Sequence, residues 1–317
     1  MIVPCFTRSR VHIITIVTAF AMLLFCKTAF TQDTAASSGR IDGLQALNGY
    51  TQTFYYSTGH EKRAGDIAVF IENAGRYFQN EVAFTPKIQL YILAPRDWKK
   101  WAAKPLHEVY GFPHNVDDSR LVIASEDNDF WRSYLPPADK LSPSMAAKVK
   151  KAYGRPDGTQ SMMPFFDLLA LHEMGHSYTA QAGLKMHRHW MGELFVNIML
   201  HTYIAEKQPE LLPALETFPD MVIAAGTEEF KFTSLEDFER LYATMGMGPK
   251  NYGWYQSRLH SAAKEIYNAG GKMVLIKLWK ALKQHQEAMT DREFTDMLQK
   301  EVHVSVADVF RKWNKVN

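Results

Sequence analysis

The apolar segment Pro164–Gly183 contains the sequence His172-Glu-Met-Gly-His176, which constrains this chain more than any other feature. Leu168 and Leu169 belong to a helical apolar pattern, and the segment begins with proline and ends with glycine, as helices do. Residues four apart share a helix face, so His172 and His176 can bind one ion from the same side. Two unpaired histidines on so apolar a helix would be costly to bury, so the segment predicts a metal site.

Glu173 lies about 100° around this helix from His172, at the edge of the same face. From there its carboxylate can reach a water molecule held by the ion. A zinc ion lowers the pKa of such a water to about 7, and a nearby carboxylate can take its proton as the water attacks a carbonyl group. The spacing predicts hydrolysis with Glu173 as general base. The alternative is a helix that binds no metal, with its histidines at the surface or hydrogen-bonded within the core.

Three residues compete to be the third metal ligand. His187 and His189 lie in a polar connector, whereas Glu193 lies on the next predicted helix, residues 189–206. A rigid helix can hold a ligand in place, and two histidines with one glutamate form an established catalytic zinc set with a fourth position open for water. We therefore favour Glu193, with one Zn²⁺ as the cofactor, and keep the two histidines as alternatives.

The first 31 residues have the pattern of a signal peptide. Arg8 and Arg10 precede the apolar run Val11–Phe25, which has 15 residues. A membrane-spanning helix needs about 20 residues, so the run suits a cleaved leader better. The small residue Thr31 suits cleavage after it. We expect a secreted or periplasmic protein, and an uncleaved membrane anchor is the alternative.

Both cysteines, Cys5 and Cys26, lie in this leader. The exported part would then have no disulfide and would depend on its core and on a metal ion for stability. Phe25 precedes Cys26 where lipid-attachment signals carry a small residue, so lipidation is disfavoured. Contact with a membrane is expected only through an uncleaved or lipidated N-terminus.

The composition is that of a folded globular protein, with 46% hydrophobic and 13% aromatic residues. The formal net charge is +2, and removing the three cations of the leader leaves about −1. No basic block remains, so nucleic acid is not an expected partner.

Four regions follow one another along the chain: the signal peptide (1–31), a flexible tether of small polar residues (32–45), an α+β part (46–160) and a helical catalytic part (161–317). The α+β part is expected to hold strands at 50–58, 86–94 and 120–125, a helix at 63–80, and a proline-rich connector at 127–160 with one short helix. Beyond residue 206, helices are expected at 233–246, 253–268, 271–286, 290–301 and 305–315. The predicted fold class is α+β, a small mixed sheet with helices followed by a mainly helical half.

The histidine motif followed by Trp190-Met-Gly-Glu193 resembles the gluzincin zinc metallopeptidases, which include thermolysin and aminopeptidase N-type enzymes. In layout the resemblance covers roughly residues 50–315, and the zinc motif is its specific part. It implies a zinc-metallopeptidase-like fold with His172, His176 and Glu193 as ligands and Glu173 as general base.

The resemblance also implies roles for residues outside the ligand set. Asn197 follows Glu193 by four residues, where thermolysin-like enzymes place an acid that orients a zinc-bound histidine. Such enzymes stabilise the oxyanion with a tyrosine or a histidine, and Tyr255 is our first candidate and Tyr252 the second. Ordinary aromatic packing is the alternative for both tyrosines.

Two departures from the family bear on the activity. Leu194 stands where the family carries a small residue, and the aminopeptidase motif G-x-M-E-N is missing. The strand at 121–125 is a candidate edge for an extended peptide, or else an interior strand. We expect an exported zinc-dependent metallopeptidase acting on a peptide or protein, and the alternative is a noncatalytic binding module that keeps the fold and the zinc.

Overall fold

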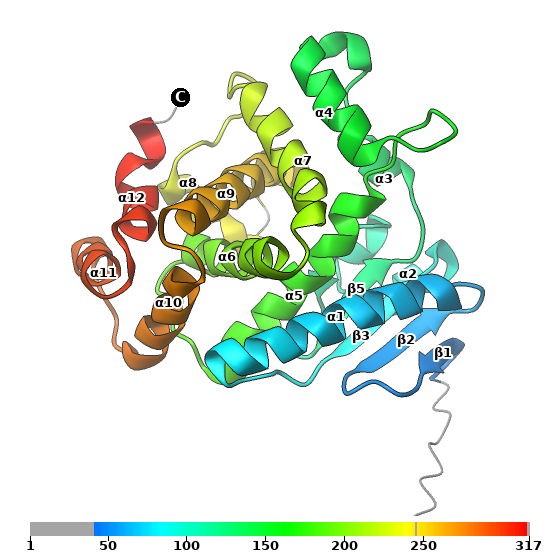
Figure 1. Ribbon diagram of the computed structural model, residues 1–317, viewed down its shortest axis with the longest axis horizontal. Helices are drawn as coiled ribbons and strands as arrows, with labels where there is room; N and C mark the ends of the chain where they lie inside the picture. The colour runs from blue at the N-terminus through cyan, green and yellow to red at the C-terminus, as the bar shows by residue number, and fades with distance from the viewer. Residues whose placement is uncertain (1–40, 245, 316–317) are drawn as a thin grey trace, which may run out of the picture. The chain divides into compact units, whose positions relative to one another are not determined.

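Short runs of branched and aromatic residues form a five-stranded mixed sheet in the computed structural model, which describes residues 41–244 and 246–315 (Figure 1). The strands are β1 (Leu44–Leu47), β2 (Thr53–Ser57), β3 (Gln89–Leu93), β4 (His114–Asn115) and β5 (Arg120–Ala124). Their order is β1-β2-β3-β5-β4, with β2, β3 and β5 parallel and the two outer strands antiparallel to their neighbours.

Both edges of the sheet differ from the sequence expectation. β1 pairs with β2 and buries Leu44 completely, so regular structure already begins within the predicted tether. β5 lies between β3 and β4, so of the two alternatives for residues 121–125 the interior strand is confirmed and the edge strand is excluded. The true edge strand, β4, is too short to show a periodic pattern in the sequence.

Helices make up most of the remaining described residues. The α-helices are α1 (Glu61–Val82), α2 (Pro95–Trp101), α3 (Asp129–Arg132), α4 (Pro143–Tyr153), α5 (Met163–Ala182), α6 (His189–Lys207), α7 (Leu212–Ala224), α8 (Leu235–Leu241), α9 (Gly248–Gly270), α10 (Lys272–Gln284), α11 (Asp291–Met297) and α12 (Val304–Lys312). Single turns of 3₁₀-helix include η4 (Tyr242–Thr244), and a π-helical turn at Leu298–Val302 links α11 to α12. The predicted α+β class is confirmed.

The helices covering the sheet arise from local sequence. α1 carries the chain from β2 to the parallel strand β3 and buries Ile67, Ile71 and Phe78. α5 contacts α1 as well as β4 and β5, and α2 packs against β3 and β5. α5 therefore joins the sheet to the helical half, and the described residues belong to one compact unit.

α6 lies at the centre of the helical half, in contact with α5, α7, α8, α9 and α10 (Figure 1). Every residue from Trp190 to Ile204 except Gly192 is buried. A helix that is apolar on all sides must be surrounded, which explains this central place. Glu193 and Asn197 are buried polar residues on this otherwise mainly apolar helix.

Some helices were not predicted from the sequence, or were predicted with other bounds. α7 has prolines at Pro213 and Pro219, which hid its helical pattern, and α9 begins five residues before the predicted start at 253. The connector at 127–160 holds α3 and α4, where one short helix was expected.

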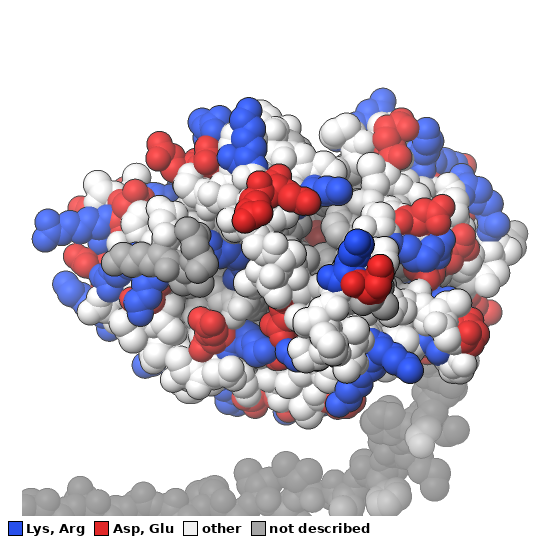
Figure 2. All heavy atoms as spheres, turned by 90° about the horizontal axis from the view of Figure 1, so that it is seen from above, with Lys and Arg blue, Asp and Glu red and all other residues white. Residues whose placement is uncertain are grey.

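Figure 2 shows acidic and basic side chains interspersed over one face of the molecule, in line with the formal charge of +2. Within residues 41–244 and 246–315, no helix is long and apolar enough to cross a membrane. The predicted signal peptide lies outside the described residues.

Candidate metal centre

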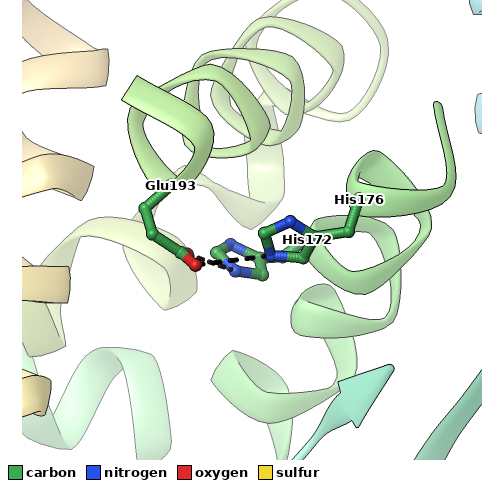
Figure 3. A group of neighbouring side chains, drawn as sticks. All are labelled: His172, His176 and Glu193. Carbon is green, nitrogen blue, oxygen red and sulfur yellow. Dashed lines mark ion pairs between the residues drawn. The ribbon is translucent and has the colours of Figure 1, made fainter. Parts of the chain in front are cut away.

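Three potential ligands converge where α5 packs on α6. Figure 3 shows His172 and His176 projecting from one helix toward Glu193 on the other. Nε2 of His172 lies 3.2 Å from Oε2 of Glu193, and Nε2 of His176 lies 3.7 Å from Oε1. One ligand atom from each residue lies within 4.8 Å of the others, so the group could hold a metal ion. The structure thus brings together the three residues that the sequence predicted.

Glu193 is fixed by neighbours from outside its own helix. The hydroxyl of Tyr242 in η4 donates to Oε1, and the side-chain amide of Gln256 in α9 donates to Oε2 at 2.7 Å. Burial acts to raise the pKa of Glu193, but His176, His172 and the Tyr242 hydrogen bond together hold it well below its usual range. The carboxylate is therefore ionised and held in one orientation.

A chain of hydrogen bonds sets the tautomer of His172. Because the Glu193 carboxylate only accepts, Gln256 turns its amide nitrogen toward it, and its oxygen accepts from Asn197 Nδ2 at 3.1 Å. The Asn197 oxygen then faces His172 Nδ1 at 2.8 Å, so Nδ1 donates. Nε2 of His172 is left with a lone pair directed at Glu193.

The arrangement fits a bound cation. A lone pair of His172 and a carboxylate oxygen of Glu193 face each other at 3.2 Å, and two acceptors this close need a proton or a metal ion between them. Burial opposes charge on His172, but the hydrogen bond and charge of Glu193 raise its pKa to about 8. Two imidazoles and one carboxylate suit zinc, and Asn197 supplies the outer hydrogen bond that such histidine ligands make.

Glu173 carries a buried carboxylate next to this group, and it is not one of the three potential ligands. It lines the same cavity as the two histidines and Glu193. Burial raises the pKa of Glu173 to about 7, although the charge of His172 and a backbone hydrogen bond from Asn115 oppose the rise. A carboxyl group with this pKa can both take up and release a proton near neutral pH.

The alternative third ligands lie elsewhere. Nε2 of His187 is 3.1 Å from the carbonyl oxygen of His285, and the His187 ring contacts Phe294. His189 stacks on Tyr242, with 4.9 Å between ring centroids. Neither histidine lines the cavity, so of the three candidates only Glu193 lies next to His172 and His176.

The structure separates the two tyrosine candidates. Tyr255 is fully buried outside the cavity, where its hydroxyl donates to the carbonyl oxygen of Ser234 at 2.7 Å and its ring stacks on Trp313. Tyr252 lines the cavity, and its hydroxyl oxygen accepts from Gln256 Nε2 at 2.7 Å. The first choice, Tyr255, therefore does not reach the candidate site, whereas the second does.

Sequence reasoning missed Tyr242, Gln256 and His260, all of which line the cavity. A signal for two of them was present, since Tyr252, Gln256 and His260 recur every four residues and so share one face of α9. Burial lowers the pKa of His260 well below its ordinary value, so its imidazole is neutral. Tyr242 lies in a short turn whose position no local pattern predicts.

Comparisons of the chain with protein-family models, with curated proteins and with solved structures found no match in any of the three. The family resemblance noted in the sequence therefore has no support from these comparisons. The geometry of the centre defines a possible metal-binding group of two histidines and one glutamate.

Proposed function

We propose that this protein is a zinc-dependent metallopeptidase of the gluzincin type. The observation that carries the proposal is a group of three donors, two histidines and one glutamate, beside a second carboxylate, Glu173, in one cavity. Three protein ligands leave a position open for water, whereas a structural zinc site is usually closed by four. Zinc bound there would supply Lewis-acid chemistry and lower the pKa of a water molecule to roughly 7.

Side chains of the protein have the remaining roles in the reaction, namely proton transfer and positioning of the ligands. Glu173 accepts the proton of the attacking water and returns it to the leaving amine. Asn197 holds His172 in the tautomer that leaves Nε2 free for the ion, and Tyr242 and Gln256 hold Glu193. These buried contacts keep the ligands in place before substrate arrives, so little reorganisation is required.

Tyr252 replaces Tyr255 as the candidate donor to the oxyanion. Its oxygen already accepts from Gln256, which leaves its own O–H proton free to donate. Because Tyr252 lines the cavity, that proton can reach a carbonyl oxygen as negative charge develops on it.

An edge strand beside the centre supports a peptide substrate. β4 is the last strand of the sheet, and both of its residues, His114 and Asn115, line the cavity. An extended peptide can add to such an edge through main-chain hydrogen bonds. This placement favours peptide bonds over amides of small molecules.

Hydrolysis of a mixed peptide library by the purified protein tests the proposal. We expect cleavage that a chelator abolishes and added zinc restores. Glu173→Gln should retain zinc but lose about 10²–10⁴-fold in rate, since it removes the base. Glu287→Gln changes an exposed acid outside the cavity and serves as the matched control. A zinc-loaded parent without hydrolysis would instead favour the noncatalytic binding module.

Export is part of the proposal, and the motivation is the N-terminal leader pattern. N-terminal sequencing of protein recovered outside the cytoplasm should find a chain that begins at Gln32. A chain that begins at Met1 in a membrane fraction would indicate an uncleaved anchor.

A further inference from the structure

The connector between α5 and α6, residues 183–188, is held by a segment far along the chain. α5 ends at Ala182 and α6 begins at His189, so this connector joins the helix of the two candidate ligand histidines to the helix of Glu193. The segment that it contacts, residues 282–291, runs from the end of α10 to the first residue of α11. None of the residues of that segment lines the cavity of the candidate metal centre.

Hydrogen bonds attach the start of the connector to α10. The backbone N–H of Lys185 donates to the carbonyl oxygen of Leu282 at 3.0 Å. The ammonium group of Lys283 donates to the carbonyl oxygen of Ala182, which is the last residue of α5. The chain is therefore bound to α10 from the point where it leaves α5.

The turn that leads into α6 has an unfavourable backbone conformation. His187 lies in the left-handed region, with a φ of 57°. A residue with a side chain adopts this conformation only where its surroundings hold it. Nε2 of His187 donates to the carbonyl oxygen of His285 at 3.1 Å, and its ring packs on Phe294 with 4.9 Å between ring centroids. Contacts with the C-terminal part of the chain therefore hold this turn.

Arg188 makes several contacts at the end of the connector. Its Nε donates to Oδ1 of Asp291 at 2.8 Å, and its Nη2 donates to the carbonyl oxygen of Met289 at 3.0 Å. Nη1 donates to the carbonyl oxygen of His187 at 2.6 Å, and the guanidinium carbon lies 5.9 Å from the ring centroid of Phe294. Four groups therefore hold this half-buried side chain in one position.

An arginine is unusual at the position that Arg188 occupies. It is the N-cap residue of α6, where Ser, Thr, Asp and Asn are preferred because their side chains accept hydrogen bonds from the first turn. An arginine side chain has no acceptor, and its charge is unfavourable at the positive end of the helix dipole. The capping role falls to Glu239 of α8, which accepts from the backbone N–H groups of His189 and Trp190 at 3.0 and 2.9 Å. The arginine is therefore explained by its pairing with Asp291, not by capping.

The position of the start of α6 decides where Glu193 lies. Glu193 follows Arg188 by five residues, and its carboxylate has to lie next to two imidazoles that belong to α5. A slip of the helix by one residue would move it about 1.5 Å along its axis. The geometry of a functional site has to be held to within about 0.5 Å, so even a partial slip would disturb the group.

We propose that Arg188 is a positioning residue of the candidate metal centre. Paired with Asp291, it sets the position of α6 and thereby the position of Glu193 relative to the two histidines. The inference rests on the metal binding of the proposed function. It adds that α10 and α11, which carry none of the candidate ligands, are required for full zinc affinity.

Zinc affinity, measured by competition with a chelator of known affinity, tests this role. Arg188→Met should bind zinc about 2- to 30-fold more weakly than the parent, because the start of α6 is no longer fixed. Arg311→Met is the matched control: Arg311 also pairs with an acid of α11, Asp296, at 3.5 Å, but from α12 and not from the connector. The control should keep the affinity of the parent.

A double-mutant cycle shows whether the two residues act as a pair. Asp291→Ala should also weaken zinc binding, and the double variant with Arg188→Met should lose less than the sum of the two single losses in binding free energy. Strict additivity would show that Arg188 does not act through Asp291 and would overturn the pairing.

Visible absorption of the cobalt-loaded protein gives a readout that a general loss of stability would not change. The spectrum of Co²⁺ bound in place of zinc depends on the arrangement of its ligands. We expect an altered spectrum for Arg188→Met and the spectrum of the parent for Arg311→Met. Arg188→Lys keeps the charge and should partly restore both the spectrum and the zinc affinity.

The outcomes separate this inference from the proposed function. Unchanged zinc affinity and an unchanged cobalt spectrum in Arg188→Met would overturn the inference and leave the proposed function intact. A loss in Arg188→Met but not in Arg311→Met supports the inference even if the parent hydrolyses no peptide, in which case only the proposed function fails. Equal losses in both variants would show a general effect of stability and would overturn the inference. A parent that binds neither metal ion would overturn both.

Discussion

Gly175 of α5 lies directly against Val196 of α6. A Cβ atom on Gly175 would stand 2.8 Å from Cβ and Cγ1 of Val196 and 3.4 Å from its Cα. The missing side chain lets the two helices approach closely at the level of the candidate metal centre. The glycine between Glu173 and His176 therefore has a packing role, since it allows Glu193 to reach both histidines.

Gly175→Ala should push α5 and α6 apart. We expect overpacking to cost about 1–3 kcal/mol, partly offset by roughly 1 kcal/mol of gained helix propensity. Denaturant unfolding and zinc titration should both show the loss. Gly65→Ala is the control, because a Cβ there meets nothing within 4 Å and should be neutral or stabilising. Adding Val196→Ala should restore zinc affinity, and the absence of any rescue would contradict this account.

Glu193→Gln should abolish stoichiometric zinc binding. The parent should carry about one zinc ion per chain, and the variant should lose it because an amide replaces the only carboxylate in the group. Elemental mass spectrometry on purified protein measures this directly. His187→Gln and His189→Gln should keep the ion. Zinc retained by Glu193→Gln but lost from either histidine variant would reassign the third ligand.

Asn197→Ala should weaken zinc binding by about 10–100-fold, because the tautomer and orientation of His172 are no longer held. Competition with a chelator of known affinity gives the change. Asn251→Ala is the matched control: Asn251 is also buried and hydrogen-bonded, but to the backbone of Phe232. That variant should lose stability without losing zinc affinity, and a similar loss of affinity in both would rule out a specific role.

His114 should make the zinc-free protein less stable in mild acid. Burial lowers the pKa of His114 to about 4 from 6.5, although its hydrogen bond to the Phe112 carbonyl opposes the shift. The unfolded chain takes up this proton below about pH 6.5 and the folded chain only below about pH 4. The stabilisation is therefore complete above pH 6.5 and is lost as the pH falls to 4.

The loss amounts to about 3 kcal/mol in the free energy of unfolding. Comparing the parent with His114→Asn across this range, with chelator present, isolates the contribution, since all other groups titrate in both proteins. The parent's advantage should shrink by about this amount between pH 7 and pH 4. A constant difference would show that His114 does not carry the effect.

Local sequence accounts for the parts of the centre that one helix can build. The helical period places His172 and His176 on one face and Glu173 at its edge, whatever the rest of the chain does. The all-round apolarity of residues 190–204 likewise indicates a central helix, on which Glu193 is held rigidly. These features depend on contacts between near neighbours, which the sequence displays.

The tertiary structure alone decided which groups surround the ligands. Tyr252 and Tyr255 are three residues apart on α9, and only the rotation of that helix against α6 and α8 sends one into the cavity and the other to Ser234. Tyr242 reaches Glu193 from a short turn, and the edge position of β4 follows from long-range strand pairing. Such contacts join residues tens of positions apart, and the packing of whole elements, not any local period, sets them.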